Sequence, residues 1–465
     1  NPIFYCEPKI DGLAIELVYE NGVFVQGSTR GDGLVGEDVT QNLKTIEAIP
    51  LKLEISKSKY QVPKRLVVRG EVFLTKKEFA RINKEQEKKG EKLYANPRNV
   101  AAGSIRQLDP SIVASRKLDS YAYSLVTDLG QKTHEDEHNI LKELGFKTNP
   151  DTKRIAALEE IFAYRDMVAK LREKLPYEID GVVIIINDER TFEEAGVIGK
   201  APRAAIAYKF SPKEATTRVK EIVVQVGRTG ALTPVAVLEP VEVAGVTISH
   251  ATLHNFDEIK RLDVRVGDTV IVSRAGDVIP KVLKVLAELR TGKEKAFRMP
   301  ERCPVDGGKV VIEGVMYRCG NPQCGARHKE QLYHFVSRGA FNIEGLGPKI
   351  IDRFLDEGLI SDAADLFLLK TDDINSLERF GEKSAQNIIY EVSLRKKISL
   401  PRFLYSLGII HVGEENSRVL ASEFLKIGGR IDSPKDVLKI GIGLSEEKLF
   451  EVPDIGPAIA KSILE

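Results

Sequence analysis

Short apolar runs rich in β-branched and aromatic residues alternate with charged, amphipathic stretches over the first part of the chain. The runs predict strands at residues 13–19, 65–73, 118–126 and 181–187. The stretches at 76–89 and 157–174 repeat apolar residues at helical spacing and predict helices. This mixture predicts an α+β domain over residues 1–215.

Beyond residue 216 the pattern changes to short strands separated by turn signals, expected at 221–226, 234–243, 245–249, 269–273 and 282–286. Five short strands in one stretch predict an OB-fold β-barrel over residues 216–300. The next segment, 301–328, is too short for a hydrophobic core of its own, and we expect a small zinc finger there.

The remaining segment, 329–465, has a helical pattern with four near-repeats, each an apolar residue, a glycine, small or polar residues and a helix. These repeats resemble helix-hairpin-helix modules and predict an all-α domain. Their glycines would free backbone N–H groups at helix N-termini, where phosphates bind readily. Ordinary glycine caps would explain one such glycine. The four-fold repetition favours DNA contact by Gly347, Gly381, Gly413 and Gly456.

A length of 465 residues predicts several domains. The 69 lysines and arginines nearly balance 68 aspartates and glutamates, so a nucleic-acid binder must place its positive charge locally or use backbone N–H groups. We find no secretory signal and no apolar stretch of about 18 residues, and therefore expect a cytoplasmic protein without membrane contact. Three of the four cysteines cluster, which suggests metal ligands rather than a disulfide framework.

The segment Glu7-Pro8-Lys9-Ile10-Asp11-Gly12 carries the first candidate chemistry. A lysine attacks phosphorus or a carbonyl as the free amine, Asp11 could orient that amine or hold a metal, and Gly12 would let the backbone approach a nucleotide. Glycine-rich, basic or acidic motifs follow at 29–33, 69–73, 96–106, 178–183 and 201–210. Each alone fits a turn or a strand end, but their order and spacing favour a nucleotide site.

This series resembles the motifs of covalent nucleotidyltransferases, and the whole chain resembles bacterial NAD-dependent DNA ligases. The resemblance implies an enzyme of DNA replication and repair that seals 5′-phosphate/3′-hydroxyl nicks through a lysyl-AMP intermediate, with NAD as the adenylate donor. The implied catalytic residues are Lys9, as nucleophile, with Asp11, Asp180 and Lys209. The implied nucleotide-binding residues, beside the cofactor Mg²⁺ or Mn²⁺, are Glu7, Arg30, Glu71, Tyr123, Arg172 and Lys209.

The resemblance also implies contacts with nicked double-stranded DNA by a monomer. Besides the hairpin glycines, the implied DNA-binding residues are Arg98, Arg106, Arg228, Arg274, Val278 and Ile279. Apolar side chains in a widened minor groove sense shape rather than sequence, which suits an enzyme that seals any nick. The alternative interpretation is that the segments around Arg228 and Arg274 are two ordinary turns of the barrel.

Two positions depart from the family pattern. Ile185 stands where the family has a lysine that faces the reacting phosphate, and loss of such a contact often costs roughly 10²–10³ in rate. Asp306 stands where the second of four metal-binding cysteines is expected, and His328 is an alternative fourth ligand. The predicted zinc ligands are Cys303, Asp306, Cys319 and Cys324.

Two other functions compete with this interpretation. The family carries an N-terminal nicotinamide-binding domain and a C-terminal BRCT domain, and neither is recognised here, so we expect a piece of a longer protein. The alternative is then a catalytically weakened nick-binding fragment that seals only pre-adenylated DNA. A relative that uses ATP or GTP, such as an RNA ligase or a capping enzyme, is disfavoured by the cysteine cluster and the hairpin repeats.

Overall fold

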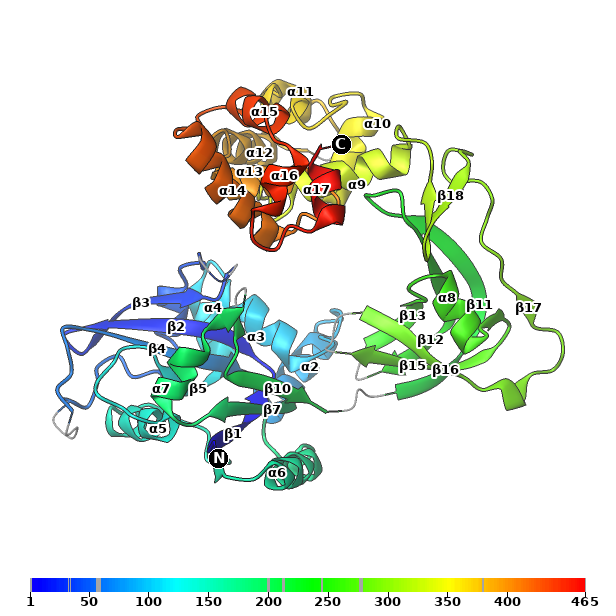
Figure 1. Cartoon of the computed structure of the whole chain (residues 1–465). Coiled ribbons are helices and arrows are strands. Elements are labelled where there is room, and N and C mark those ends of the chain that lie inside the picture. The colour runs from blue at the N-terminus through cyan, green and yellow to red at the C-terminus, as the bar shows by residue number, and fades with distance from the viewer. Residues whose placement is uncertain are drawn as a thin grey trace. The chain divides into compact units, whose positions relative to one another are not determined.

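The computed structural model describes residues 2–31, 33, 35–55, 60–198, 201–210, 214–243, 246–275, 279–378 and 380–464. The chain forms two compact units, whose elements are drawn in Figure 1. The first unit comprises Asn1–Ala215, Pro240–Ile248 and Ser273–Pro280, and the second comprises Thr216–Glu239, Ser249–Val272 and Lys281–Glu465.

Two antiparallel sheets of four strands each form the framework of residues 1–215. The first has the strand order β10 (Ala205–Lys209), β7 (Ile179–Ile186), β1 (Phe4–Ile10) and β6 (Lys153–Ile155). The second has the order β3 (Val23–Thr29), β2 (Leu13–Glu20), β4 (Arg65–Phe73) and β5 (Asp119–Leu125). The four strands predicted here are confirmed, and the bend at Asp11 and Gly12 links the two sheets.

The helices of this part are α1 (Thr40–Leu43), α2 (Lys76–Lys88), α3 (Pro97–Ile105), α4 (Pro110–Ser115), α5 (His134–Glu143), α6 (Leu158–Leu171) and α7 (Glu189–Ala195). Both predicted helices are confirmed, as α2 and α6. Side-chain oxygens accept backbone N–H groups at the starts of α2, α3, α5 and α7, which fixes where these helices begin; the capping residues are Thr75, Asn96, Thr133 and Asp188. A short hairpin of β8 (Val197–Ile198) and β9 (Ala201–Pro202) follows α7.

Side chains alternate between the two faces of β1, and this alternation positions the candidate site. Cys6 packs into a core with Val182 of β7 and Tyr164 of α6, the helix that Figure 1 shows beside this sheet. Glu7 and Lys9 therefore point to the opposite face. The second sheet has a separate core with α1, α2, α3, α4 and α5.

A closed five-stranded barrel follows, so the predicted barrel is confirmed. Its strand order is β11 (Glu214–Val226), β12 (Leu232–Val243), β13 (Val246–Thr252), β16 (Ile279–Val285) and β15 (Thr269–Ala275). Between β13 and β15 the chain forms α8 (Phe256–Leu262) and a short strand, β14 (Arg265–Val266). This strand pairs with β17 (Lys295–Ala296), which follows β16. A hairpin of β18 (Val310–Glu313) and β19 (Met316–Cys319) comes next.

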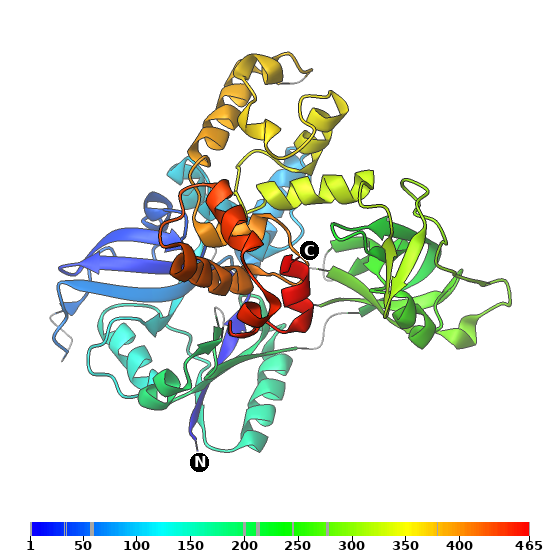
Figure 2. The same ribbon diagram turned by 45° about the horizontal axis from the view of Figure 1, so that its top comes forward.

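The last part of the chain is helical, as predicted, and Figure 2 shows its helices, coloured yellow to red, crossing one another. They are α9 (Gly325–Val336), α10 (Pro348–Asp356), α11 (Thr371–Asn375), α12 (Glu382–Leu394), α13 (Leu400–Ser406), α14 (Glu414–Gly428), α15 (Pro434–Ile442), α16 (Glu446–Phe450) and α17 (Pro457–Leu464). The helices up to α12 share one core, and those from α13 onward share a second. The four predicted hairpin glycines directly precede α10, α12, α14 and α17.

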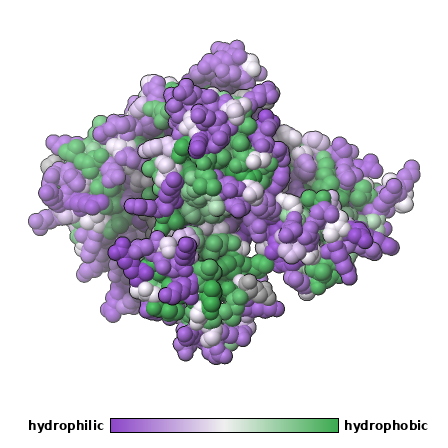
Figure 3. Space-filling view, turned by 90° about the horizontal axis from the view of Figure 1, so that it is seen from above, coloured by the Kyte–Doolittle hydropathy of each residue, from purple (hydrophilic) through white to green (hydrophobic). Residues whose placement is uncertain are grey.

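The hydropathy of the visible surface does not by itself indicate a binding site. In Figure 3, hydrophilic side chains cover much of the visible face, with apolar patches among them. Within the described ranges, no helix combines the length and the apolar character needed to span a membrane.

Candidate active site

Lys9 and Lys209 lie on the two strands that flank β7, and both are paired with Gly181. The register of β1 against β7 shifts after Lys9, which leaves Asp180 as an extra residue on β7. Such a bulge turns a side chain away from the regular alternation. Oδ1 of Asp180 lies 3.0 Å from Nζ of Lys9, and its Oδ2 lies 3.1 Å from Nζ of Lys209. One carboxylate therefore holds both predicted catalytic lysines.

The bend after β1 carries a second ion pair. Oδ1 of Asp11 lies 3.1 Å from Nη1 of Arg98, in the first turn of α3. A Cβ on Gly12 would lie 2.3 Å from the carbonyl oxygen of Val72, so only glycine lets the bend approach β4 this closely. That approach brings Glu71 of β4 next to the bend. Burial raises the pKa of Glu71 to about 7, although the charges of Lys9 and Arg98 oppose the shift.

Tyr123 also occupies a bulge. Ala122 is paired with Gly70 and Ser124 with Arg69, so Tyr123 is the extra residue on β5. Burial raises the pKa of this phenol. The charges of Glu71 and Glu7 act in the same direction, and those of Arg69 and Arg30 oppose them. The phenol of Tyr123 is thus within electrostatic range of three other predicted nucleotide-binding residues, Glu7, Arg30 and Glu71.

Glu7 lies in a buried cluster that the sequence analysis missed. Oε2 of Glu7 is 3.4 Å from Nε2 of His138, and Nδ1 of His134 is 3.2 Å from Oε1 of Glu137. Burial raises the pKa of Glu7 to about 7 and lowers that of His138 to about 3. Burial also opposes protonation of His134, but the carboxylates of Glu137 and Glu7 outweigh it and raise the pKa of His134. The two histidines four residues apart were the available signal.

The remaining predicted nucleotide and phosphate contacts occupy varied surroundings. Arg172 directly follows α6, and its guanidinium carbon lies 5.7 Å from the ring centre of Phe210, the residue after Lys209. Nε of Arg106 lies 2.9 Å from Oε2 of Glu37, and Arg30 is exposed.

Ile185 points to the same face of the first sheet as Lys9 and Lys209. Across β1, Gly181 is opposite Lys9, and Ile185 is opposite Tyr5. Because side chains alternate along a strand, positions 181 and 185 point to the same side. The side chain of Ile185 is buried, with 8% of its surface exposed.

The predicted metal ligands come together. Cys303, Cys319, Cys324 and Asp306 each offer a ligand atom within 4.8 Å of the others, and the three cysteines are buried. Nε2 of His328 instead lies 2.7 Å from the carbonyl oxygen of Ser361, so Asp306, and not His328, completes this group. Burial raises the pKa of Cys319 to about 12, whereas a hydrogen bond from the backbone N–H of Gly308 lowers the pKa of Asp306. Three thiols and one carboxylate fit the ligand chemistry and number of a zinc site.

The predicted DNA contacts differ in how far the structure describes them. Arg228 packs against Gly408: its Nη1 lies 2.5 Å from the position a Cβ would take there. Arg274 and Ile279 lie in β15 and β16, but their side chains are outside the described part, as is Val278 altogether. A Cβ on any of the four hairpin glycines would meet no described atom within 4 Å.

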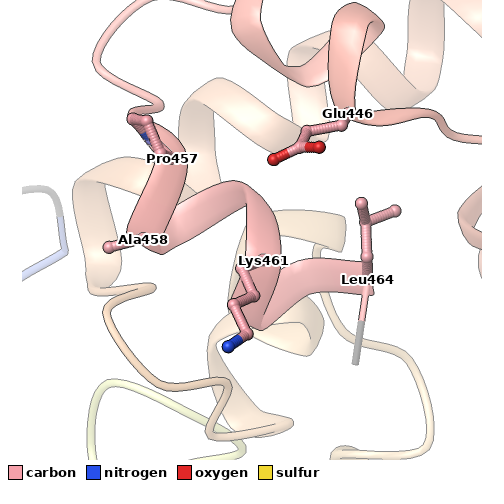
Figure 4. A pocket seen from close by; sticks show the side chains of 5 residues that line it. All are labelled: Glu446, Pro457, Ala458, Lys461 and Leu464. Carbon is pink, nitrogen blue, oxygen red and sulfur yellow. The ribbon is translucent and has the colours of Figure 1, made fainter.

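A separate hollow of about 560 Å³ lies at α16 and α17. Figure 4 shows its lining residues, Glu446, Pro457, Ala458, Lys461 and Leu464. None of the predicted site residues lines it.

The fold and the paired lysines define the class: a multidomain nucleotidyltransferase with a barrel and hairpin helices. Residues 1–213 match the NAD-dependent DNA ligase adenylation domain, residues 216–294 the NAD-dependent DNA ligase OB-fold domain, and residues 340–394 a SAM-like helix-hairpin-helix tandem. The chain belongs to the NAD-dependent DNA ligases.

Curated relatives agree with this assignment. The DNA ligase of Pelotomaculum thermopropionicum is 47% identical over 476 residues, which cover 99% of this chain and 68% of that protein. The DNA ligase of Bacillus cytotoxicus is 47% identical over 469 residues, covering 100% and 67%. The DNA ligase of Halothermothrix orenii is 48% identical over 467 residues, covering 99% and 67%. The chain is therefore an enzyme that seals nicks in DNA with NAD as adenylate donor, and the nick-binding alternative is not favoured.

Proposed function

We propose that Lys9 is the nucleophile of this ligase and that Asp180 holds it in place. The shared carboxylate, 3.0 Å from Nζ of Lys9 and 3.1 Å from Nζ of Lys209, carries this proposal. Lys9, as the free amine, attacks the α-phosphorus of NAD, so that an N–P bond forms and the P–O bond to nicotinamide mononucleotide breaks. Lys209, held on the other oxygen of Asp180, faces the negative charge that develops on the phosphate.

Adenine and ribose would be held by side chains of both sheets. Glu7 reads the adenine edge, Tyr123 stacks on the ring, and Arg30 and Glu71 position the ribose. Arg172 and Lys209 contact the phosphates. Bound Mg²⁺ or Mn²⁺ supplies charge neutralisation at the phosphates, and the carboxylates of Asp11 and Asp180 are of the type that such ions prefer.

DNA contact would combine side chains with backbone groups. Arg98 and Arg106, together with Arg228, Arg274, Val278 and Ile279, contact the duplex around the nick. The hairpin glycines support a backbone contact: the φ angles of Gly347, Gly381 and Gly413 are ordinary, −85°, −93° and −85°, so these positions do not need glycine for their conformation. A phosphate that approaches the N–H groups of the following helix does need the space.

We propose the domain limits 1–215, 216–300, 301–328 and 329–465, with zinc in the third domain. Cys319 anchors this zinc finger on the turn between β11 and β12, because its N–H donates to the carbonyl of Gly230 at 2.9 Å. Val226 and Leu232 of those strands pack in one apolar cluster with the three cysteines. The enzyme acts as a cytoplasmic monomer.

The test is transfer of label from NAD carrying radioactive phosphorus in its adenylate half. The chain should become labelled, ATP should give no label, and Lys9→Arg should abolish labelling because guanidinium is not a nucleophile at neutral pH. Adenylated nicked duplex should be sealed in the same assay. Label that persists in Lys9→Arg would assign the nucleophile to another residue.

A further inference from the structure

The cluster around Glu7 brings together groups of different chemistry from two elements. His134 and His138 lie on one face of α5, since helical residues four apart are neighbours. Glu7, on β1, and the two histidines each offer one ligand atom within 4.8 Å of the others. Their exposed fractions are 7% for Glu7, 6% for His134 and 1% for His138, so bulk water has little access.

The histidine rings carry nitrogens that the protein does not satisfy. Nε2 of His134 is buried and has no hydrogen-bond partner among the described residues. Nε2 of His138 is in the same condition, because the carboxylate of Glu7 at 3.4 Å lacks hydrogen-bond geometry. Leaving a buried polar group unpaired is destabilising, and native proteins rarely do so. The described residues therefore leave these two ring nitrogens available to a ligand.

The surroundings of His134 favour a metal ion as that ligand. Metal-binding histidines usually donate their other ring N–H to a carboxylate, which fixes the tautomer and the ring orientation. Nδ1 of His134 faces Oε1 of Glu137 at 3.2 Å, and Oε2 of Glu137 accepts the backbone N–H of Leu125 at 2.7 Å. This arrangement leaves Nε2 of His134 as the ring nitrogen that can bind a metal ion. Two imidazoles and one carboxylate form a ligand set that zinc accepts.

We propose that Glu7, His134 and His138 bind a transition-metal ion such as Zn²⁺ when the adenylate site is empty, with Glu137 orienting His134. Glu7 is also the proposed reader of adenine, so metal and nucleotide exclude each other. Zinc at this position then inhibits adenylation of Lys9 in competition with NAD. The inhibition rests on the role proposed for Glu7, whereas the metal site does not.

Stoichiometry tests the site. Elemental analysis after equilibration with Zn²⁺ should find one more bound zinc ion per chain in the original protein than in the variants His134→Gln and His138→Gln. Each variant removes one ligand of the proposed site. His250→Gln, which replaces an exposed histidine of β13, should keep that zinc ion. Glu137→Gln should lower zinc affinity by about 10- to 100-fold, because it removes only the orienting carboxylate.

A second measurement needs no variant. Co²⁺ is added to the chain after its cysteine cluster has been filled with Zn²⁺. Visible absorption without the strong thiolate-to-metal band would mark a cobalt ion on imidazole and carboxylate. If no further Co²⁺ binds, water satisfies the ring nitrogens, and the proposed site is rejected.

Kinetics separates the two parts of the proposal. The initial rate of Lys9 labelling should fall in proportion to zinc occupancy of this site, and raising NAD should restore it. Zinc that binds here without slowing labelling would keep the metal site and refute the adenine role of Glu7. A chain that binds no extra metal yet is labelled normally would refute the metal site and leave that role intact.

Discussion

Lys9 and Lys209 share the two oxygens of the Asp180 carboxylate, at 3.0 Å and 3.1 Å. The two lysines reach it from opposite sides of β7, and the bulge at position 180 turns the carboxylate toward both. In the proposed reaction Lys9 loses its proton before it attacks, so Lys209 is the cation that remains beside the phosphate. The arrangement suits a reaction in which phosphate charge must be stabilised while one amine attacks.

The first prediction concerns Asp180→Asn. The amide keeps the size of the side chain but removes the charge that holds both lysines. Without these ion pairs both lysines lose their fixed position, and a misplaced reacting group can cost about a hundredfold, so the rate of Lys9 adenylation by NAD should fall roughly ten- to a hundredfold. Single-turnover labelling measures this rate. The matched control is Asp257→Asn, since Asp257 lies 3.1 Å from Lys260 but on the exposed surface of α8, and it should leave the rate unchanged. Equal rates in both variants would contradict the role of Asp180.

The second prediction concerns pH and Glu71. Burial raises the pKa of Glu71 in the folded chain to about 7, above its unfolded value near 4.5. The folded state then binds the proton more tightly, so stability falls as pH rises from about 4.5 to about 7. Glu71→Gln removes this loss, which amounts to at most about 3 kcal/mol.

Urea unfolding at pH 5 and at pH 8 measures the effect. The stability of Glu71→Gln relative to the original chain should be higher at pH 8 than at pH 5. The exposed Glu20 provides the control, because Glu20→Gln should give the same difference at both pH values. A difference for Glu71→Gln that does not change with pH would mean that Glu71 is ionised in the folded state at both.

Much of this architecture is readable from local sequence. The strands at Leu13–Glu20 and Arg65–Phe73 follow from alternating and β-branched residues, and the hairpin repeats follow from their glycines. The bulges at Asp180 and Tyr123 could not be predicted, because a bulge depends on the register of a partner strand distant in the sequence. Both bulges carry predicted site residues, so local pattern identified the residues but not how they are aimed.

The buried histidines illustrate a different limit. The spacing of His134 and His138 is a local signal that was present in the sequence. Their partner Glu7 lies on β1, and only the packing of α5 brings the helix and the strand together. The choice between Asp306 and His328 likewise needed the fold, since the carbonyl of Ser361 that engages His328 lies far along the chain.

The third prediction concerns zinc at the cysteine cluster. Asp306→Cys replaces a carboxylate by a softer thiolate and should slow zinc loss to a chelator, whereas Asp306→Ala should speed it. His328→Gln should leave zinc retention unchanged, because its ring engages Ser361. Zinc release is followed with a metal-sensitive dye. Faster release from His328→Gln than from Asp306→Ala would make His328 the fourth ligand.

The fourth prediction concerns Ile185→Lys. Position 185 faces the same side of the first sheet as Lys9 and Lys209, so a long cationic side chain there extends toward the proposed phosphate position. A recovered contact of this kind should raise the rate of a phosphoryl-transfer step, by up to roughly 10²–10³. Ile185→Met is the control for length without charge and should leave the rate unchanged. If folded Ile185→Lys has the same phosphoryl-transfer rate as the original chain, position 185 does not reach the phosphate.

The fifth prediction concerns the hairpin glycines. A Cβ at Gly413 would meet no described atom within 4 Å, and its φ of −85° suits any residue. Gly413→Ala should therefore leave the unfolding transition unchanged or slightly stabilised. The methyl group would occupy the space through which a DNA phosphate reaches the first N–H groups of α14. Loss of one such contact, about 1–2 kcal/mol, should weaken binding of nicked duplex roughly five- to thirtyfold.

Gly441→Ala, within α15 and equally free of described neighbours, is the matched control and should keep full affinity. If Gly413→Ala binds the duplex as tightly as Gly441→Ala, the backbone of this hairpin does not contact phosphate.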